Sequence, residues 1–254
     1  MLLGMSYEEI PAQSVASAEA MLLTRPSDEE FSKALLGVGL HEMNRKAAEQ
    51  FCRWHVRYGG GVTCRSALLA LAHLARRFGD CDGQTWILVT SLRDDPRFVG
   101  LWSDVADDVH QFVQKPPTWI KPVLSLDGSK VNGLADFWSQ VDTILEPGVF
   151  WGRNLDAFND ILRGGFGTPE DGFVLRWKEV GHCRSTLGHA ETARWLEQML
   201  EQCHPTDRTS VTQRLERARA GDGDTLFEIL VHIIRKHGPG GSEHLDFVDL
   251  DLAD

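Results

Sequence analysis

Two consecutive prolines near the middle of the chain divide it into segments with different patterning. Lys115–Thr118 reads KPPT, and no helix can run through it, because proline lacks an N–H and disfavours helical backbone in the residue before it. Apolar residues recur at helical spacing before this point, whereas short alternating stretches are interspersed with helical patterns after it. We therefore predict two domains, residues 1–117 and residues 118–254.

The first segment predicts short helices that end at glycine or proline. They are expected over Asp28–Gly37, from His41 to the glycines at 59–61, through ALLALAHLARRFG to Gly79, over Trp86–Leu92 and over Phe98–Phe112. Helices of this length typically stack as antiparallel pairs. The phrases ALLALAHLARRFG and DDPRFVGLWSDVADDVHQFV resemble HEAT-type repeats of bacterial immunity proteins, which implies an all-α, HEAT-like domain.

The second segment alternates strand and helix patterns. Strands are predicted at Pro122–Leu126, Phe173–Trp177 and Phe247–Leu252. Helices are predicted at about 134–145, 154–163, 190–202, 210–220 and 225–236. Strands separated by helices are typical of a small, mostly parallel sheet covered by helices, so we expect an α/β domain here.

The charge of the chain argues against direct contact with nucleic acid. It carries 26 Lys and Arg against 37 Asp and Glu, a net charge of −11. Before Thr118 there are 12 basic and 15 acidic residues, a net of −3, and from Thr118 onward 14 and 22, a net of −8. Such a surface repels phosphate backbones and favours a basic protein partner.

Neither a membrane span nor export is expected. No apolar run approaches the roughly 18 residues that a spanning helix needs, and the opening MLLGMSYEEIPAQ has no basic leader. The five cysteines, an odd number scattered over both segments, suit reduced thiols. We therefore expect a soluble, cytoplasmic protein without a membrane partner.

A short helix in the second segment separates an apolar face from an acidic one. Its apolar residues, Leu155, Phe158, Ile161 and Leu162, share one face and are expected to pack on the sheet. The opposite face carries Asp156, Asn159, Asp160 and Arg163. Like charges four residues apart repel slightly, by about 0.2–0.5 kcal/mol, so the acidic face is either simply solvated or kept for a basic partner.

The residues before this helix favour the second interpretation. Asn154 is a suitable N-cap, and Gly152 is expected to let the chain turn sharply. Phe150 and Trp151 place large aromatic rings beside the cap, where they are expected to be either buried or used in binding.

The segment FWGRNLDAFNDIL resembles the barstar family of intracellular ribonuclease inhibitors. The resemblance extends through VLSLDG and NGLADFWSQVDTIL before it, and GFVLRW, LFEILVHIIRKHG and FVDLDL after it. It covers roughly Pro122–Leu252 and implies a three-stranded parallel sheet flanked by helices. It also implies that the acidic helix and the preceding loop fill a ribonuclease active site, with carboxylates where substrate phosphates bind.

The resemblance also implies roles for single residues. Asp160 would be the central carboxylate, Asp156 its partner, and Phe150 the aromatic that stacks on the catalytic histidine of the enzyme. The predicted partner-binding set is Phe150, Trp151, Gly152, Asn154, Asp156, Asn159 and Asp160.

Three departures from the family pattern point to a different cognate toxin. Arg153 stands where the family often has an acid, and Asn159 stands where an aromatic is expected. On the last helix, Arg235 and Lys236 stand where a supporting acid is expected, and Glu228 is the only candidate for that role. We expect an immunity protein that inhibits a basic toxin nuclease, most simply a ribonuclease, one to one. The alternative is a non-inhibitory protein–protein adaptor that keeps the fold.

The helical domain has two interpretations that the sequence leaves open. It is either a second immunity module, which neutralises another toxin or another surface of the same toxin, or a docking scaffold that stabilises the inhibitor domain.

No enzyme, metal or cofactor chemistry is predicted. His182-Cys183 and Cys203-His204 are adjacent pairs rather than zinc-ligand spacings, and Asp104, Asp107 and Asp108 are expected to form a solvated face. The GGFG stretch lacks the lysine of a P-loop, and no G-x-S-x-G occurs, so no catalytic residue is expected.

Overall fold

The computed structural model describes residues 10–254 and divides them into two compact units. The first unit ends at Ile120, and the second spans Lys121–Asp254. The acidic opening segment used to predict the absence of a signal peptide lies largely outside the described residues.

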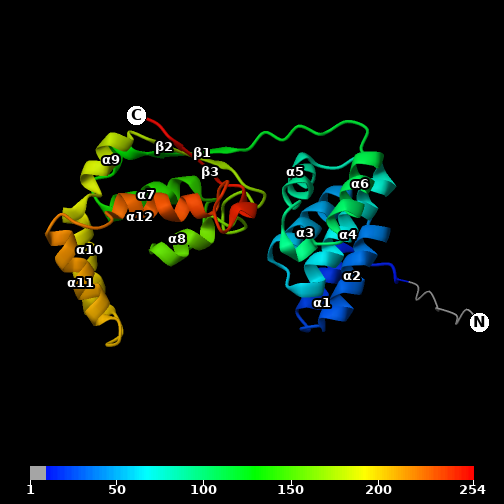
Figure 1. Ribbon diagram of the computed structural model, residues 1–254, viewed down its shortest axis with the longest axis horizontal. Helices are drawn as coiled ribbons and strands as arrows, with labels where there is room; N and C mark the ends of the chain where they lie inside the picture. The colour runs from blue at the N-terminus through cyan, green and yellow to red at the C-terminus, as the bar shows by residue number, and fades with distance from the viewer. Residues whose placement is uncertain (1–9) are drawn as a thin grey trace, which may run out of the picture. The chain divides into compact units, whose positions relative to one another are not determined.

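The first unit is helical throughout its described part (Figure 1). Its elements are α1 (Val15–Leu22), α2 (Asp28–His41), α3 (Arg45–Tyr58), α4 (Gly61–Phe78), α5 (Gly83–Ser91), the single-turn 3-10 helix η1 (Pro96–Phe98) and α6 (Trp102–Phe112). The prediction of a helical first domain is therefore confirmed.

Helix α4 forms the centre of this unit and packs against α2, α3 and α6. Its leucines at 68, 71 and 74 are fully or almost fully buried, as the broad apolar stripe predicts. The helix ends at Gly79, whose positive φ of 63° provides a left-handed cap. The contact with α2 is so close that a Cβ on Gly39 would lie 2.7 Å from the Ala70 Cα, so only glycine fits there.

Two features of the first unit differ from the sequence prediction. Helix α1 was not predicted; its signal is a capping box in which the Ser14 side chain accepts from the backbone N–H of Ser17. The helix expected over Phe98–Phe112 is interrupted, because Gly100 adopts a left-handed φ of 75° and α6 begins only at Trp102.

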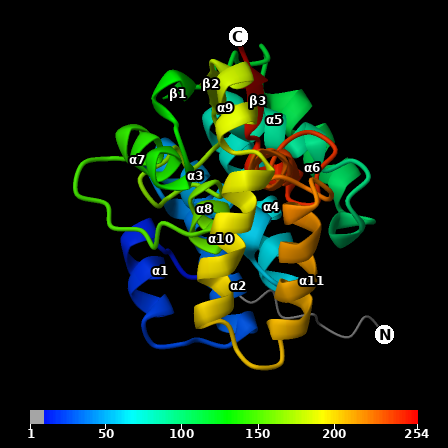
Figure 2. The same ribbon diagram turned by 90° about the vertical axis from the view of Figure 1, so that its left-hand side faces the viewer.

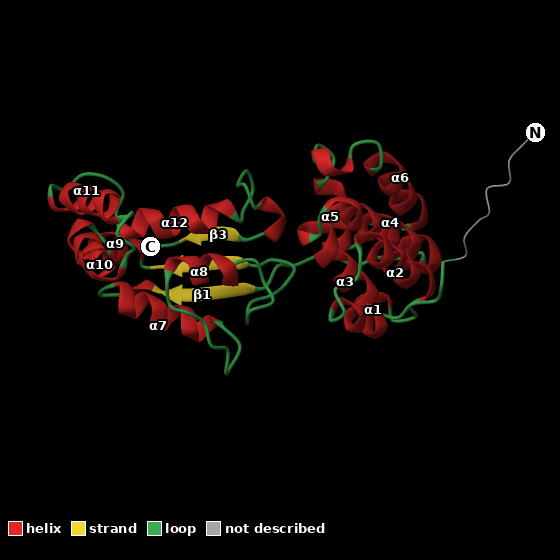
Figure 3. Cartoon of the chain, turned by 90° about the horizontal axis from the view of Figure 1, so that it is seen from below, coloured by secondary structure: helices red, strands yellow, loops and turns green. Residues whose placement is uncertain are grey.

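The second unit is built on a three-stranded parallel sheet in the order β1-β2-β3. Figure 3 shows the three arrows pointing the same way. The strands are β1 (Val123–Asp127), β2 (Val174–Lys178) and β3 (Asp249–Leu252). The helices are α7 (Leu134–Ile144), α8 (Leu155–Ile161), α9 (Val180–Thr186), α10 (His189–Gln202), α11 (Arg208–Arg219) and α12 (Leu226–Lys236), with the 3-10 helices η2 (Gly128–Lys130) and η3 (His244–Asp246). The predicted α/β class is confirmed.

Helices α7, α8 and α12 lie on one side of this sheet (Figures 1 and 3). Right-handed crossovers that move in one direction along a sheet place their helices on the same face, which explains the arrangement. Leu175 and Trp177 of β2 point into the core on that face. The other face is polar, and Arg176 pairs there with Asp251 of β3 at 2.6 Å.

Helices α10 and α11 run side by side as a hairpin with a small core of its own (Figure 2), and the hairpin lies beside the sheet (Figure 1). That core consists of Ala193, Leu196, Val211, Leu215 and Ala218. Helix α9, which precedes the hairpin, was not predicted, because at seven residues its periodicity is too short to recognise.

Across the described residues, no helix combines the length and the apolar character that crossing a membrane would require.

Candidate partner-binding surface

Helix α8 is held by its apolar face and presents its acidic face outward. Phe158, Ile161 and Leu162 are buried in the core of the second unit, as their spacing predicts. Asp156 and Asp160 are exposed on the opposite face. The sheet and its covering helices therefore fix the orientation of this acidic face.

The start of α8 depends on its cap. The Asn154 Oδ1 accepts a hydrogen bond from the Ala157 N–H at 2.8 Å, as predicted for an N-cap. Gly152 does not make the turn that the sequence suggested, because the left-handed residue is Arg153, with φ of 45°. A Cβ on Gly152 would lie 2.9 Å from the Asn154 Nδ2, so a larger residue there would have to displace the capping side chain.

The two aromatic residues before the cap have opposite surroundings. The Trp151 side chain is only 8% exposed, packs edge-on against Trp138 and donates from Nε1 to the Asp142 Oδ1 at 2.8 Å. Phe150 is 97% exposed. A firmly anchored tryptophan thus holds a fully solvated phenylalanine at the surface.

The Asp142 carboxylate of α7 anchors this loop at two points. Its second oxygen accepts from the Arg153 Nη2 at 2.6 Å, which neutralises the positive charge beside Phe150. Asp142 also lines, with residues 149–153, an open hollow of about 380 Å³ beside the exposed ring.

On the acidic face, an arginine links one carboxylate to a distant loop. Arg163 pairs with Asp160 at 2.6 Å and donates from Nε to the Glu243 Oε2 at 2.9 Å. The hydrogen bond with Glu243, aided by both neighbouring carboxylates, raises the pKa of the Arg163 guanidinium. Within residues 10–254 Asp156 makes no ion pair, so it is the carboxylate most available to a partner.

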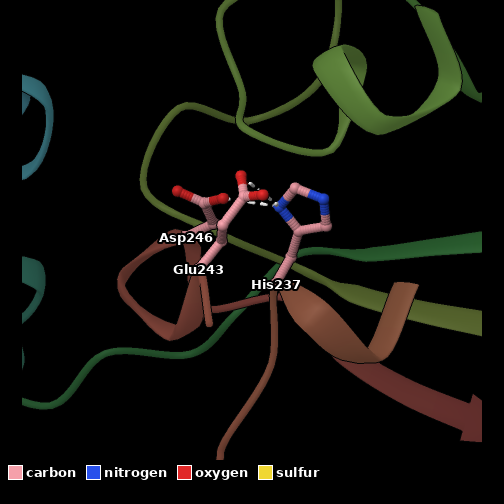
Figure 4. Close-up of side chains that lie close together, drawn as sticks. All are labelled: His237, Glu243 and Asp246. Carbon is pink, nitrogen blue, oxygen red and sulfur yellow. Dashed lines mark hydrogen bonds and ion pairs between the residues drawn. The ribbon is translucent and has the colours of Figure 1, made fainter. Parts of the chain in front are cut away.

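Asn159, the third polar residue of α8, is half-buried and faces a histidine. Its Oδ1 lies 3.2 Å from Nε2 of His237, which follows α12 directly and is fully buried. The other ring nitrogen, Nδ1, lies 2.5 Å from the Asp246 Oδ2. Figure 4 shows the carboxylates of Glu243 and Asp246 directed at this ring.

In the described part of the chain, His237, Glu243 and Asp246 are the one group whose potential metal-ligand atoms all lie within 4.8 Å of one another. Arg163 donates to the same Glu243 oxygen that approaches His237, so a guanidinium already compensates the carboxylate charge. The pairs His182-Cys183 and Cys203-His204 form no such group among these residues; the Cys183 thiol is buried against the Trp177 indole.

Sequence reasoning did not find the residues that reach this surface from elsewhere. Asp142 contacts the loop from α7, while Glu243 and His237 are about eighty residues from α8, so no local spacing reveals them. Glu228, the acid expected to support the face, instead closes the capping box of α12 with Thr225. Glu243, an acid that follows α8 in sequence, is joined to Asp160 through Arg163.

Residues 121–233 match the family model described as Barstar (barnase inhibitor). The match lies within the second unit and includes β1, β2 and α8. This part of the chain is therefore a barstar family domain, as the resemblance of FWGRNLDAFNDIL and its flanking segments predicted. Neither the curated proteins nor the solved structures contain a match to the chain.

Proposed function

We propose that this chain, with its barstar family domain, is an immunity protein that inhibits a bacterial toxin nuclease by covering the active site of the enzyme. The observation that carries the proposal is Phe150, which is 97% exposed on a loop anchored by a buried tryptophan. A large apolar ring that is held in place without burial is typical of a residue that fills a pocket on a partner.

The charges beside Phe150 favour a nuclease as that partner. Asp156 and Asp160 present exposed carboxylates on the helix that follows the Phe150 loop, and a nuclease active site concentrates cations that bind phosphate groups. The net charge of −8 from Thr118 onward would steer a basic enzyme toward this face and speed association at low salt. We expect a one-to-one complex with a ribonuclease, formed in the cytoplasm of the cell that makes the toxin.

The family match supports an inhibitor rather than an enzyme. Its description names the inhibition of barnase, a role that depends on a surface and needs no catalytic group of the inhibitor. The residues proposed to bind the partner are Phe150, Trp151, Gly152, Asn154, Asp156, Asn159 and Asp160. Trp151, Gly152 and Asn154 support the proposed surface by anchoring, spacing and capping rather than by exposing large side chains.

The test is capture of the products of neighbouring genes with the tagged full-length chain, followed by a ribonuclease assay on what binds. We expect a basic partner whose RNA cleavage stops at one equivalent and resumes when the chain carries Asp156→Ala with Asp160→Ala. Glu201→Ala with Asp224→Ala removes the same charge at exposed acids outside the face and should leave inhibition intact.

An adaptor without inhibitory activity is the second candidate. Asn159 is hydrogen-bonded to His237, so its side chain is partly occupied within the domain. Asp160 is already paired with Arg163, which, among the described residues, leaves Asp156 as the unpaired carboxylate of this helix. A captured partner without nuclease activity, or one that binds the Asp156 and Asp160 double variant equally well, would favour the adaptor and overturn the inhibitor proposal.

A further inference from the structure

Beneath the acidic face, Asp246, His237 and Asn159 form a hydrogen-bonded chain, and the role assigned to it here rests on the proposed function. His237 bridges two acceptors, the Asp246 carboxylate at 2.5 Å from Nδ1 and the Asn159 Oδ1 at 3.2 Å from Nε2. His237 is 0% exposed and Asp246 only 3%. The ring and Asp246 are therefore shielded from water, and their hydrogen bond is satisfied within the protein.

The orientation of the Asn159 amide requires a hydrogen on Nε2. An ionised carboxylate only accepts hydrogen bonds, so Asp246 takes the hydrogen on Nδ1. The amide oxygen of Asn159 also only accepts, so it needs a second hydrogen on Nε2. In this arrangement both ring nitrogens of His237 act as hydrogen-bond donors.

Carboxylates and a helix terminus surround this ring. Glu243 approaches Nδ1 to 3.8 Å, and Asp246 lies closer still. His237 also caps the carboxyl end of α12, where the helix dipole favours positive charge. The opposing charge that faces this cluster is Arg163, which is shared between Glu243 and Asp160 on the side toward α8.

We propose that His237 is a positioning residue that holds the Asn159 oxygen inward, so that the amide NH₂ group is offered to the partner beside Asp156 and Asp160. If Nε2 lost its hydrogen, it would become an acceptor and the amide would turn over. The binding face would then present an oxygen at that point. His237 thus determines whether the face offers a hydrogen-bond donor beside its two carboxylates or a third acceptor. This choice selects partners by their hydrogen-bond pattern.

The first test needs no partner. Ring ¹⁵N–¹H correlation spectra of the full-length chain, labelled at histidine, are recorded at the pH of the inhibition assay, and His237→Gln assigns the signals. We expect both nitrogens of His237 to be protonated. A ring with hydrogen on Nδ1 alone would overturn the proposal, whatever the outcome of the capture experiment.

The same spectra separate this proposal from metal binding. With zinc chloride added, the ring signals of His237 should not change, because Arg163 already occupies the carboxylate that a metal would need. Loss of the Nδ1 hydrogen on zinc addition would assign the cluster to metal binding and overturn the positioning role.

The second test measures affinity for the nuclease recovered by capture. Asn159→Ala and His237→Gln should each weaken binding about tenfold, and the pair together by little more than either alone, because one acts through the other. Independent, multiplicative losses would contradict the proposal.

A substitution at the surface keeps the test independent of folding. Asn159→Asp retains an inward oxygen for His237 but removes the outward donor, so we expect it to weaken binding although it adds negative charge. Binding as tight as that of the wild type would show that no donor is required and would overturn the proposal.

Discussion

The surroundings of single residues separate stability from binding in the loop before α8. Trp151 is buried against Trp138 and bonded to Asp142, whereas the neighbouring Phe150 is almost fully solvated. A buried aromatic contributes to the folded state and leaves a cavity when truncated, while a solvated one contributes almost nothing until a partner covers it.

We therefore predict opposite effects for two adjacent alanine substitutions. Trp151→Ala should lower the free energy of unfolding by about 3 kcal/mol, in the range for buried aromatics. Phe150→Ala should change the free energy of unfolding by less than about 0.5 kcal/mol. It should nevertheless weaken inhibition at least as much as Trp151→Ala does. Urea unfolding and inhibition titrations measure the two quantities. Leu23→Ala, at another exposed apolar residue, should change neither.

A histidine in the first unit predicts a loss of stability in acid. His55 packs between the rings of Phe31 and Phe51, and burial lowers the pKa of its ring from 6.5 to about 4. The unfolded chain therefore binds a proton at a pH where the folded chain does not. The resulting stability is complete above pH 6.5 and is lost as the pH falls toward 4.

Thermal or urea unfolding at pH 7 and pH 4 checks this prediction. Between these two pH values, the free energy of unfolding of the wild type should fall by roughly 2 kcal/mol more than that of His55→Leu. This loss is somewhat smaller than the full pKa difference implies, because the ring is not completely enclosed. His41→Gln, at an exposed histidine, should behave as the wild type. Equal losses in the wild type and His55→Leu would contradict the assigned cause.

At the scale of elements, α8 is too short to be stable by itself. Helices of seven residues are marginal in water, so α8 depends on its cap and on the core beneath it. The acidic face is thus a property of the packed domain rather than of the peptide.

Removal of the α8 cap should therefore damage binding more than stability alone explains. Asn154→Ala should cost about 1 kcal/mol and speed amide exchange in α8, with weaker inhibition. Asn154→Ser should restore most of both, because serine also caps. Thr225→Ala removes the equivalent cap of α12. Thr225→Ala should lower the free energy of unfolding by a similar amount but leave inhibition intact at 10 °C, where both variants stay folded. Equal losses of inhibition in Asn154→Ala and Thr225→Ala would refute a specific role for the α8 cap.

Element boundaries were predictable where a residue ends a helix by its own backbone chemistry. The left-handed Gly79 ends α4 and the prolines at 116 and 117 end the helical pattern of the first segment. The prediction failed at Gly100, where the apolar spacing continued through a break in the helix, and at α9, which is too short to show a period.

At the scale of the whole molecule, the second unit has its own core, and all the strand pairs of its sheet lie within it. Its three strands and its main cluster of buried residues lie between Lys121 and Asp254. A fragment of this extent should fold cooperatively and retain the affinity of the full chain if the helical unit is a scaffold. A loss of affinity in a folded fragment would assign the helical unit a contact with the same partner.

A shorter fragment provides the matched control. Residues 121–233, the extent of the family match, lack β3 and His237. We expect this fragment not to fold, since the Val174–Trp177 edge of β2 would be unpaired and the core uncovered. Circular dichroism and inhibition of the captured nuclease compare the two fragments.

The sequence by itself determined the change from an all-α to an α/β segment at the prolines, and the parallel sheet. It also determined the cap at Asn154 and the division of α8 into apolar and acidic faces. These follow from backbone chemistry and short-range periodicity, which act over a few residues. Only the tertiary structure decided that Trp151 is buried while Phe150 is exposed, that Arg163 joins Asp160 to Glu243, and that His237 meets Asn159. Those contacts join residues up to about eighty positions apart, and their geometry is set by the packing of α8 and α12 on one sheet rather than by any local pattern.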